Sequence, residues 1–304
     1  MRLVADIGGT NTRLAFVPSG QTQIGETRSY KNAQFSSFND VIVDFLAGFS
    51  KPSELVVAMA GPVVGNRGRL TNLNWVVDGP ELSAQYDGVS VRVINDLTAL
   101  GYAALQLSPD QVMPIVVSAA PATKQRQALV VGIGTGFNVS PVVAAAGQTI
   151  CPAVEAGHTS MYASISLALD QIEPGLSRNF PTVEALFSGR GRRKFLSLVT
   201  GQDVLRVTPF IAKQGEAGNE EADTALDTYA KLIGVLLSEL KIAYLPTNGL
   251  FLAGGVARSS LTGDRTRICA EWAMRENEYV NIAPSLSIIS DDAAALKGCA
   301  ELKL

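Results

Sequence analysis

The sequence contains very little of what metal-centred and disulfide-based chemistry requires. Its 304 residues include one histidine, His158, and three scattered cysteines, Cys151, Cys269 and Cys299. A single histidine excludes a histidine-cluster metal site, and the lack of a Cys-x-x-Cys pair disfavours a cysteine zinc site. An odd, scattered set of cysteines indicates thiols in a reducing compartment rather than a disulfide framework. We therefore expect a cytoplasmic protein.

Charged residues and long apolar runs are also scarce. Charged residues make up only 17% of the chain and the formal net charge is -3. The densest basic segment, residues 189–194, is short and typical of a solvated helix start. We therefore expect neither nucleic acid nor an anionic membrane as a partner. No uninterrupted apolar stretch reaches the length of a membrane span, and the first residues lack the features of a signal peptide.

Several common catalytic motifs are missing as well. The chain has no Gly-x-Ser-x-Gly nucleophile elbow, and a Ser-His-Asp hydrolase would depend on His158 alone. The glycine cluster at residues 132–136 lacks the Lys-Ser/Thr ending of a P-loop, which excludes that mechanism there. Strand-like residues follow this cluster where a dinucleotide-binding fingerprint requires a helix, and this disfavours a dinucleotide site.

What the sequence does contain is a regular alternation of strand-like and helix-like runs. We expect strands at Arg2–Asp6, Arg13–Val17, Glu54–Ala60, Val89–Ile94, Gln127–Ile133, Val139–Ala146, Leu250–Ala253 and Leu286–Ile289, with Thr22–Ser29 as a further candidate. Apolar residues at helical spacing predict helices over 38–49, 96–105, 222–240 and 292–302. Ser36 or Ser37 could cap the first of these helices. The alternation is typical of an α/β fold with parallel strands.

One part of the pattern occurs twice. A strand, a glycine turn and a second strand are expected at residues 4–17 and again at 129–146. This similarity suggests two related lobes, each with a glycine turn facing a shared cleft. Because no low-complexity linker separates them, the lobe boundaries must lie in connections such as the Ser108-Pro109 turn.

The glycine turns are candidates for binding phosphate. Gly8-Gly9 lies between Asp6 and Thr10-Asn11, and glycines let backbone N–H groups approach an anion closely. Asp6 could hold a magnesium ion through water beside the same phosphates. A plain β-hairpin turn explains these residues equally well. Gly134-Thr135-Gly136 and Gly254-Gly255 also follow strands, and three such clusters together favour a nucleotide clamped between lobes.

Other side chains could bind or activate a hydroxyl group. Asp96 follows a strand, where ligands bind in open α/β sheets, so it could accept a proton while Asn95 orients the hydroxyl. The same pair suits the N-cap of the next helix, which is the commoner role. Glu155 and His158 could bond neighbouring sugar hydroxyls, although a lone histidine is more often structural. Glu184 taken alone is typical of a solvated helix residue.

Taken in order, these segments resemble the bacterial glucokinase family, within the hexokinase and actin-like superfamily. The matching segments are residues 5–14, 60–63, 71–75, 94–99, 132–136, 155–158, 184–189 and 253–256. The likeness is collinear over nearly the whole chain, which is far more specific than any single motif. The chain lacks the cysteine-rich zinc motif of the related repressor/kinase group, and this places it outside that group.

The resemblance implies an α/β, two-lobed actin/hexokinase-like (ribonuclease H-like) fold with the active site in the interlobe cleft. It implies a small lobe at residues 1–105, completed by a C-terminal helix at 291–304, a large lobe at 106–290, and a homodimer. It also implies an ATP- and magnesium-dependent kinase of glycolysis that converts D-glucose to glucose 6-phosphate. A kinase for another hexose or amino sugar stays open as an alternative, as does a sugar-sensing relative with reduced activity.

The resemblance further implies roles for individual residues. It makes Asp96 the general base, and it makes Asn95, Asp96, Glu155, His158 and Glu184 the sugar ligands. It assigns the nucleotide to Asp6, Gly8, Gly9, Thr10, Asn11, Gly134, Thr135, Gly136, Gly254 and Gly255, with Asp6 holding magnesium through water. The chain departs from the family pattern at three positions, because Asn138 and Ala156 replace glycines and Arg190 replaces a proline. These departures put substrate identity and catalytic rate in question more than they do the fold.

Overall fold

The computed structural model describes residues 1–70, 73–119, 124–202, 220–280 and 282–304. The chain forms two compact units, each described below by itself. The first contains residues 1–111, 149–151 and 291–304, and the second contains residues 112–148 and 152–290. The division expected from the sequence lies at 105/106 and 290/291. Of the family segment at 71–75, Thr71 and Asn72 lie outside the described residues.

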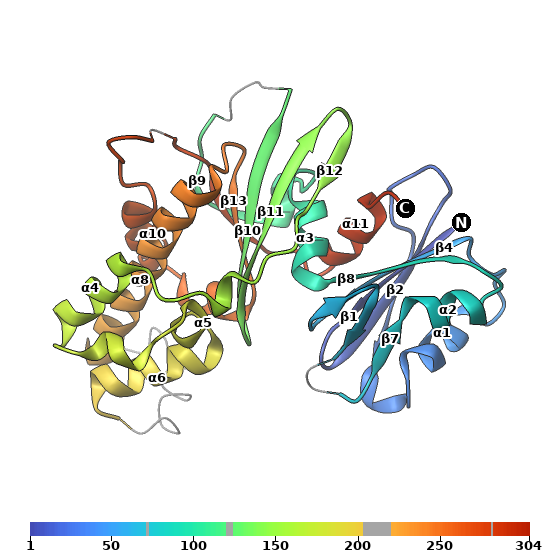
Figure 1. Cartoon of the computed structure of the whole chain (residues 1–304), viewed down its shortest axis with the longest axis horizontal. Helices are drawn as coiled ribbons and strands as arrows, with labels where there is room; N and C mark the ends of the chain where they lie inside the picture. Colours follow the sequence, from blue (N-terminus) through green and yellow to red (C-terminus); the bar gives the residue numbers. More distant parts are fainter. Residues whose placement is uncertain (71–72, 120–123, 203–219, 281) are drawn as a thin grey trace. The chain divides into compact units, whose positions relative to one another are not determined.

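The first unit is built on a five-stranded mixed sheet (Figure 1). Its strands in spatial order are β3 (Thr27–Lys31), β2 (Asn11–Val17), β1 (Arg2–Ile7), β4 (Glu54–Met59) and β8 (Ser90–Asn95). Strand β1 runs antiparallel to β2 and parallel to β4, which in turn runs parallel to β8. Ile7 pairs with Met59, and Met59 pairs with Asn95. This register brings the ends of β1, β4 and β8 to the same edge of the sheet.

Two apolar cores cover the two faces of this sheet. Leu3, Ala5 and Ile7 of β1 pack with α1 (Phe38–Leu46) on one face, whereas Val4 packs with α3 (Asp96–Ala104) and α11 (Ala294–Glu301) on the other. This alternation follows from the two-residue period of a strand. The unit also contains η1 (Asn32–Gln34), α2 (Gly79–Gln85), η2 (Pro109–Gln111) and a small sheet of β5 (Val63–Val64), β6 (Arg67–Arg69) and β7 (Val76–Asp78).

The second unit repeats the arrangement with a six-stranded sheet. The strand order is β12 (Gln148–Ile150), β11 (Phe137–Ala145), β10 (Arg126–Ile133), β13 (Leu250–Ala253), β14 (Leu286–Ile289) and β9 (Val112–Val116). Of the edge strand β12, only Gln148 is counted among the residues of the second unit. Strand β10 runs antiparallel to β11 and parallel to β13, and β13 runs parallel to β14. Each sheet therefore places a β-hairpin beside two parallel strands. The two hairpins confirm the repeat of strand, glycine turn and strand that the sequence predicted.

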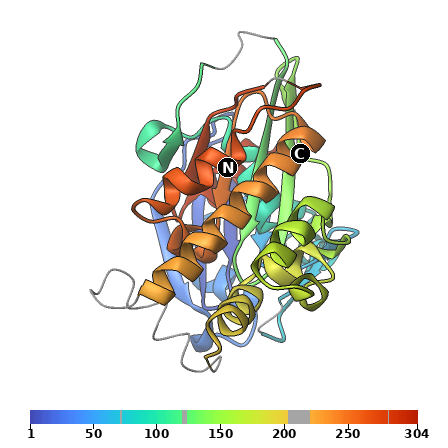
Figure 2. The ribbon, with the colours of Figure 1, turned by 90° about the vertical axis from the view of Figure 1, so that its left-hand side faces the viewer.

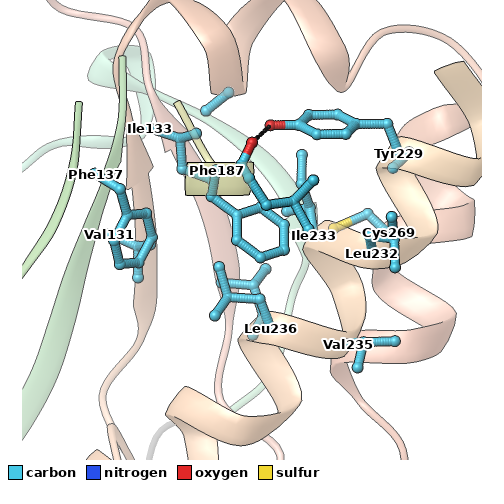
Figure 3. Close-up of a cluster of buried hydrophobic side chains, with 14 of the residues drawn as sticks. Val131, Ile133, Phe137, Phe187, Tyr229, Leu232, Ile233, Val235, Leu236 and Cys269 are labelled. Atoms are coloured by element: carbon cyan, nitrogen blue, oxygen red, sulfur yellow. Dashed lines mark hydrogen bonds between the residues drawn. The ribbon is translucent and has the colours of Figure 1, made fainter. Parts of the chain in front are cut away.

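Helices and one large apolar core complete the second unit. The helices are η3 (Ala156–His158), α4 (Ala163–Ile172), η4 (Leu176–Asn179), α5 (Val183–Leu186), α6 (Gly189–Thr200), α8 (Glu220–Tyr244), α9 (Gly255–Ser260) and α10 (Arg265–Ala273). The long α8 and α10 pack side by side (Figure 2). Phe187 and Tyr229 lie in the core (Figure 3), and the Tyr229 hydroxyl donates to the Leu186 carbonyl at 3.2 Å. That bond fixes the end of α5 against α8.

Most of the expected elements are confirmed, with small shifts at their ends. The helix expected over 38–49 ends at Leu46, and its N-cap is Ser37, which forms a capping box with Asp40. The candidate strand at 22–29 begins only at Thr27. Within the described residues, no helix combines the length and the apolar character that crossing a bilayer requires.

Candidate active site

The predicted site residues fall into two groups, one in each unit. Asp6, Gly8, Gly9, Thr10, Asn11, Asn95 and Asp96 belong to the first unit. Gly134, Thr135, Gly136, Glu155, His158, Glu184, Gly254 and Gly255 belong to the second. Most of these residues lie at the ends of neighbouring strands or in the segments that follow them, whereas Glu184 lies in the helix α5.

The first glycine turn is held by a residue that the sequence analysis missed. The Gly8 N–H donates to the Asn11 carbonyl at 2.9 Å, which closes the turn between β1 and β2. Buried Asn32 donates its side-chain amide to the Gly8 carbonyl at 2.8 Å and its backbone N–H to the Thr10 carbonyl at 2.9 Å. Its side-chain oxygen accepts from the Thr12 hydroxyl at 2.7 Å. The turn is thus a rigid hairpin whose shape is set before any ligand binds.

Asp6 lies beside this turn, close to one positively charged and one negatively charged side chain. It pairs across the sheet with Arg13, and the Arg13 Nη1 lies 3.6 Å from an Asp6 carboxylate oxygen. Burial raises the pKa of Asp6 to about 6, and the nearby charge of Asp96 adds to this shift, whereas Arg13 opposes it. Because the ionised form is disfavoured, a cation near this carboxylate would be stabilising.

The residues around Asp6 can be compared with those that a magnesium site requires. Within the described parts of the chain, no group of three or more histidine, cysteine, aspartate or glutamate side chains is arranged to hold a metal. Mg²⁺ commonly keeps several waters and takes one or two carboxylates together with substrate phosphates. Asp6, with Asp96 close enough to shift its pKa, fits that kind of site.

Asn95 and Asp96 form the helix cap, which is one of the two roles that the sequence left open. The Asn95 side-chain oxygen accepts from the Leu97 N–H at 3.0 Å, which caps α3, and its amide donates to the Gly61 carbonyl at 3.0 Å. An Asp96 carboxylate oxygen also accepts from the Leu97 N–H, at 2.8 Å. Burial raises the pKa of Asp96, because its hydrogen bonds to Leu97 and Asn95 offset only part of the lost hydration. The cap therefore holds in place a carboxylate whose affinity for protons is increased.

The glycine loop of the second unit is tied to Glu184 and to α6. The Gly134 carbonyl accepts from the Gly189 N–H at 2.8 Å, and the Phe137 N–H donates to a Glu184 carboxylate oxygen at 3.1 Å. A Cβ at Gly136 would lie 2.8 Å from that same oxygen. Glycine is therefore required there to leave room for the Glu184 carboxylate.

The third glycine cluster lies beside the second. Because Gly132 pairs with Ala253 across parallel β10 and β13, the loops that follow both strands leave the same edge of the sheet. Gly254 has a φ of 97°, and a Cβ there would collide with the Ile133 carbonyl. The cluster forms a strand-to-helix turn, since α9 begins at Gly255. Ligands of α/β proteins bind at such strand ends.

Asn138 holds Glu155 and the segment that follows it. Its amide donates to the Val154 carbonyl at 2.6 Å and to a Glu155 carboxylate oxygen at 3.2 Å, and its oxygen accepts from the Ala156 N–H at 3.0 Å. His158 is exposed at the end of η3, so packing in a core does not explain it. The sequence marked Asn138 only as a departure from the family, and its positioning role depends on contacts 16–18 residues away.

Glu184 is not the freely solvated helix residue that its local sequence suggested. It lies in the first turn of α5 with a side chain that is only 18% exposed. One carboxylate oxygen accepts the Phe137 N–H, and the other accepts Arg190 Nη2 at 2.9 Å. The structure thus presents a carboxylate of fixed orientation next to the glycine loop.

The chain is similar to known proteins over nearly its whole length. The family model described as Glucokinase matches residues 3–300. A glucokinase from Caulobacter sp. (strain K31) is 30% identical over 98% of this chain and 93% of its own length. A glucokinase from Caulobacter vibrioides (strain NA1000 / CB15N) is 28% identical over 84% of this chain and 80% of its own length.

A solved structure extends the agreement to the fold. The crystal structure of a glucokinase from an Antarctic psychrotroph superimposes with a TM-score of 0.80 at 26% sequence identity, covering 99% of this chain and 97% of that one. The predicted resemblance and the predicted hexokinase-like α/β fold are both confirmed. A family model that spans almost every residue, and a relative that aligns over 98% of the chain, show that this protein belongs to the Glucokinase family.

Proposed function

We propose that the protein is a hexokinase-type phosphotransferase that moves the γ-phosphoryl group of ATP to a hydroxyl of a hexose. D-Glucose is the proposed acceptor, and glucose 6-phosphate is the proposed product. The family membership supports the reaction class. The single observation that carries the proposal is Asp96, a carboxylate at a strand end whose pKa is raised by burial and whose position is fixed by the Leu97 N–H.

Asp96 is the proposed general base. Phosphoryl transfer needs little covalent work from a protein, so catalysis depends on positioning and on stabilising charge. A carboxylate with a raised pKa accepts the proton of a substrate hydroxyl more readily, because the best catalytic pKa lies closer to the working pH. Asn95, fixed by its bond to Gly61, is proposed to orient the same hydroxyl.

The glycine turns are the proposed nucleotide ligands. Gly8, Gly9, Thr10 and Asn11, together with Gly134, Thr135 and Gly136, are assigned to the phosphates. Gly254 and Gly255 are assigned to the adenosine. Asp6 would hold Mg²⁺ through water, and the ion would neutralise phosphate charge as it does in other phosphoryl-transfer enzymes. The rigid Asn32-braced hairpin supports this assignment, since preorganised N–H groups bind an anion without rearrangement.

Glu155, His158 and Glu184 are the proposed further sugar ligands. The support is that Glu155 and Glu184 are oriented by hydrogen bonds from Asn138, Phe137 and Arg190. Carboxylates held in this way can each accept a hydrogen bond from a hydroxyl in a fixed direction, which is how a site distinguishes sugar stereochemistry.

We extend the proposal to a homodimer that works in the cytoplasm at the entry to glycolysis. Cys269 and Cys299 are buried free thiols, which suits a reducing compartment. Sedimentation of the purified protein would test the dimer, and a monomer over the micromolar range would contradict it.

A coupled assay with ATP, Mg²⁺ and a panel of hexoses and amino hexoses tests the function. We expect the highest kcat/KM for glucose, and no turnover without a sugar acceptor. A different preferred sugar would favour the alternative of another hexose or amino-sugar kinase. Sugar binding without turnover would favour a sensor, an outcome against which the environment of Asp96 argues.

A further inference from the structure

Arg190 forms an ion pair with a proposed sugar ligand. Its Nη2 donates to a Glu184 carboxylate oxygen at 2.9 Å, and the other oxygen of Glu184 accepts the Phe137 N–H. The Arg190 side chain is 74% exposed, whereas that of Glu184 is 18% exposed. A cation thus lies on the solvent side of a carboxylate that the backbone holds in place.

The backbone around Arg190 is rigid, so this pairing is built into the fold. Ser188 is fully buried and caps α6 by accepting the Gly191 N–H at 3.1 Å. The next residue, Gly189, donates its N–H to the Gly134 carbonyl at 2.8 Å. Arg190 follows directly, between the cap and the glycine loop. The backbone therefore holds the Cα of Arg190 in a position from which its guanidinium reaches Glu184.

The pairing changes what the carboxylate can recognise. An ionised Glu184 without a partner would attract a substrate ammonium group as well as accept a hydroxyl bond. With Arg190 attached, the net charge of the pair is zero, while both oxygens still carry lone pairs that can accept from a hydroxyl. A neutral hexose keeps its hydrogen bonds, whereas a cationic amino hexose loses attraction and meets a like charge.

Resting on the proposed function, in which Glu184 contacts the sugar, we propose that Arg190 is a specificity-determining residue. It favours uncharged hexoses and rejects hexoses that carry an ammonium group. The effect is electrostatic and partly screened, because the guanidinium is largely exposed. We expect removal of its charge to raise the kcat/KM for an amino hexose relative to glucose by about 5–10-fold at low salt.

The experiment compares Arg190→Gln with the unaltered protein. Glutamine can still donate to Glu184 but carries no charge. The substrates are glucose and 2-amino-2-deoxyglucose, assayed at pH 6.5 and pH 9 in low salt. An amine of this kind titrates near the range of an α-amino group, about 7.7–8.0, so it is charged at the lower pH only.

Two further variants separate charge from packing. Arg190→Lys keeps the positive charge and should behave like the unaltered protein. Lys194→Gln removes a cation one turn further along α6, where Lys194 Nζ donates to the Asn179 carbonyl, and it should leave the selectivity unchanged. Melting temperatures should differ little among these variants, because an exposed ion pair contributes little to the free energy of unfolding.

In Arg190→Gln, we expect the ratio of kcat/KM for the amino hexose to kcat/KM for glucose to rise at pH 6.5. This rise should be smaller at pH 9 and in 1 M salt. An unchanged ratio in Arg190→Gln, or a change of equal size at both pH values, would overturn the proposed role of Arg190 while glucose turnover still supports the proposed function. If the unaltered protein transfers phosphate to no hexose, the proposed function fails, and this inference fails with it.

Discussion

The two units use the same hairpin-and-parallel-strand arrangement but place their carboxylates in opposite electrostatic surroundings. In the first unit, burial raises the pKa of both Asp6 and Asp96, and these two groups repel each other. In the second unit, Glu155 and Glu184 accept hydrogen bonds from Asn138, Arg190 and the Phe137 N–H. The first arrangement suits proton acceptance and cation binding. The second suits recognition of hydroxyl groups by carboxylates of fixed orientation.

This difference shows that the side chains and backbone groups around a strand end, rather than the order of the strands, determine which chemical role its carboxylates suit. Both hairpins end in glycine turns, yet Asn32 braces the first turn and Glu184 contacts the second loop. The four predictions below test this contrast, in order of decreasing expected effect.

Removing the proton acceptor from the first unit should have the largest effect. Asp96→Asn keeps the size of the side chain but cannot accept the substrate proton in the same way. We expect kcat to fall by about 10²–10⁴-fold while hexose binding survives. Steady-state kinetics together with calorimetric titration of the sugar would measure both quantities. Near-normal turnover in a folded variant would remove Asp96 from the catalytic role.

Asp6 should reduce the stability of the fold at neutral pH. Its pKa is about 6 in the folded protein, against 3.8 for a solvent-exposed aspartate, so the folded state binds the proton more tightly than the unfolded state. Stability should therefore fall as the pH rises from about 4 to 6, by at most about 3 kcal/mol. Asp6→Asn should raise the melting temperature at pH 8 and change it little at pH 4. A lower melting temperature at pH 8 would contradict the electrostatic account.

Removing a recognition group from the second unit should affect affinity more than turnover. His158→Ala should raise the KM for the hexose and reduce discrimination between epimers, at a cost of about 1–3 kcal/mol. ATP affinity should change little. Because His158 is exposed, the melting temperature should also stay close to that of the unaltered protein. A large loss of stability with intact selectivity would instead assign His158 a structural role.

The smallest effect is expected at Asn138. Asn138→Gly restores the residue typical of the family and removes the bonds to Glu155, the Val154 carbonyl and the Ala156 N–H. We expect the hexose KM to rise by about threefold with kcat unchanged, since a partly exposed hydrogen bond contributes about 0.5–1.5 kcal/mol. A fall in kcat without a change in KM would show that Asn138 acts on the glycine loop instead of on Glu155.

The architecture of each unit could be predicted from local patterns. Apolar runs identified the strands Leu250–Ala253 and Leu286–Ile289 at their observed bounds, because a buried parallel strand must be apolar on both faces. The sequence predicted Ser36 or Ser37 as the cap of α1, and the cap is Ser37. This could be predicted because capping is a contact between residues about three positions apart. The glycine turns could also be recognised in the sequence, because a turn is formed by consecutive residues. The order of the motifs along the chain indicated the family.

Contacts between distant residues could not be predicted in this way. Nothing near Asn32 in the sequence indicates that it braces the turn at Gly8, 24 residues away, and nothing near Glu184 indicates its bond to the Phe137 N–H, 47 residues away. The pKa shifts of Asp6 and Asp96 likewise depend on burial that exists only after the sheet has formed. The sequence alone determined which side chains are available and which strands carry them. The tertiary structure decided which carboxylates are desolvated and which are hydrogen-bonded, because electrostatic environment depends on distance in space and not on distance along the chain.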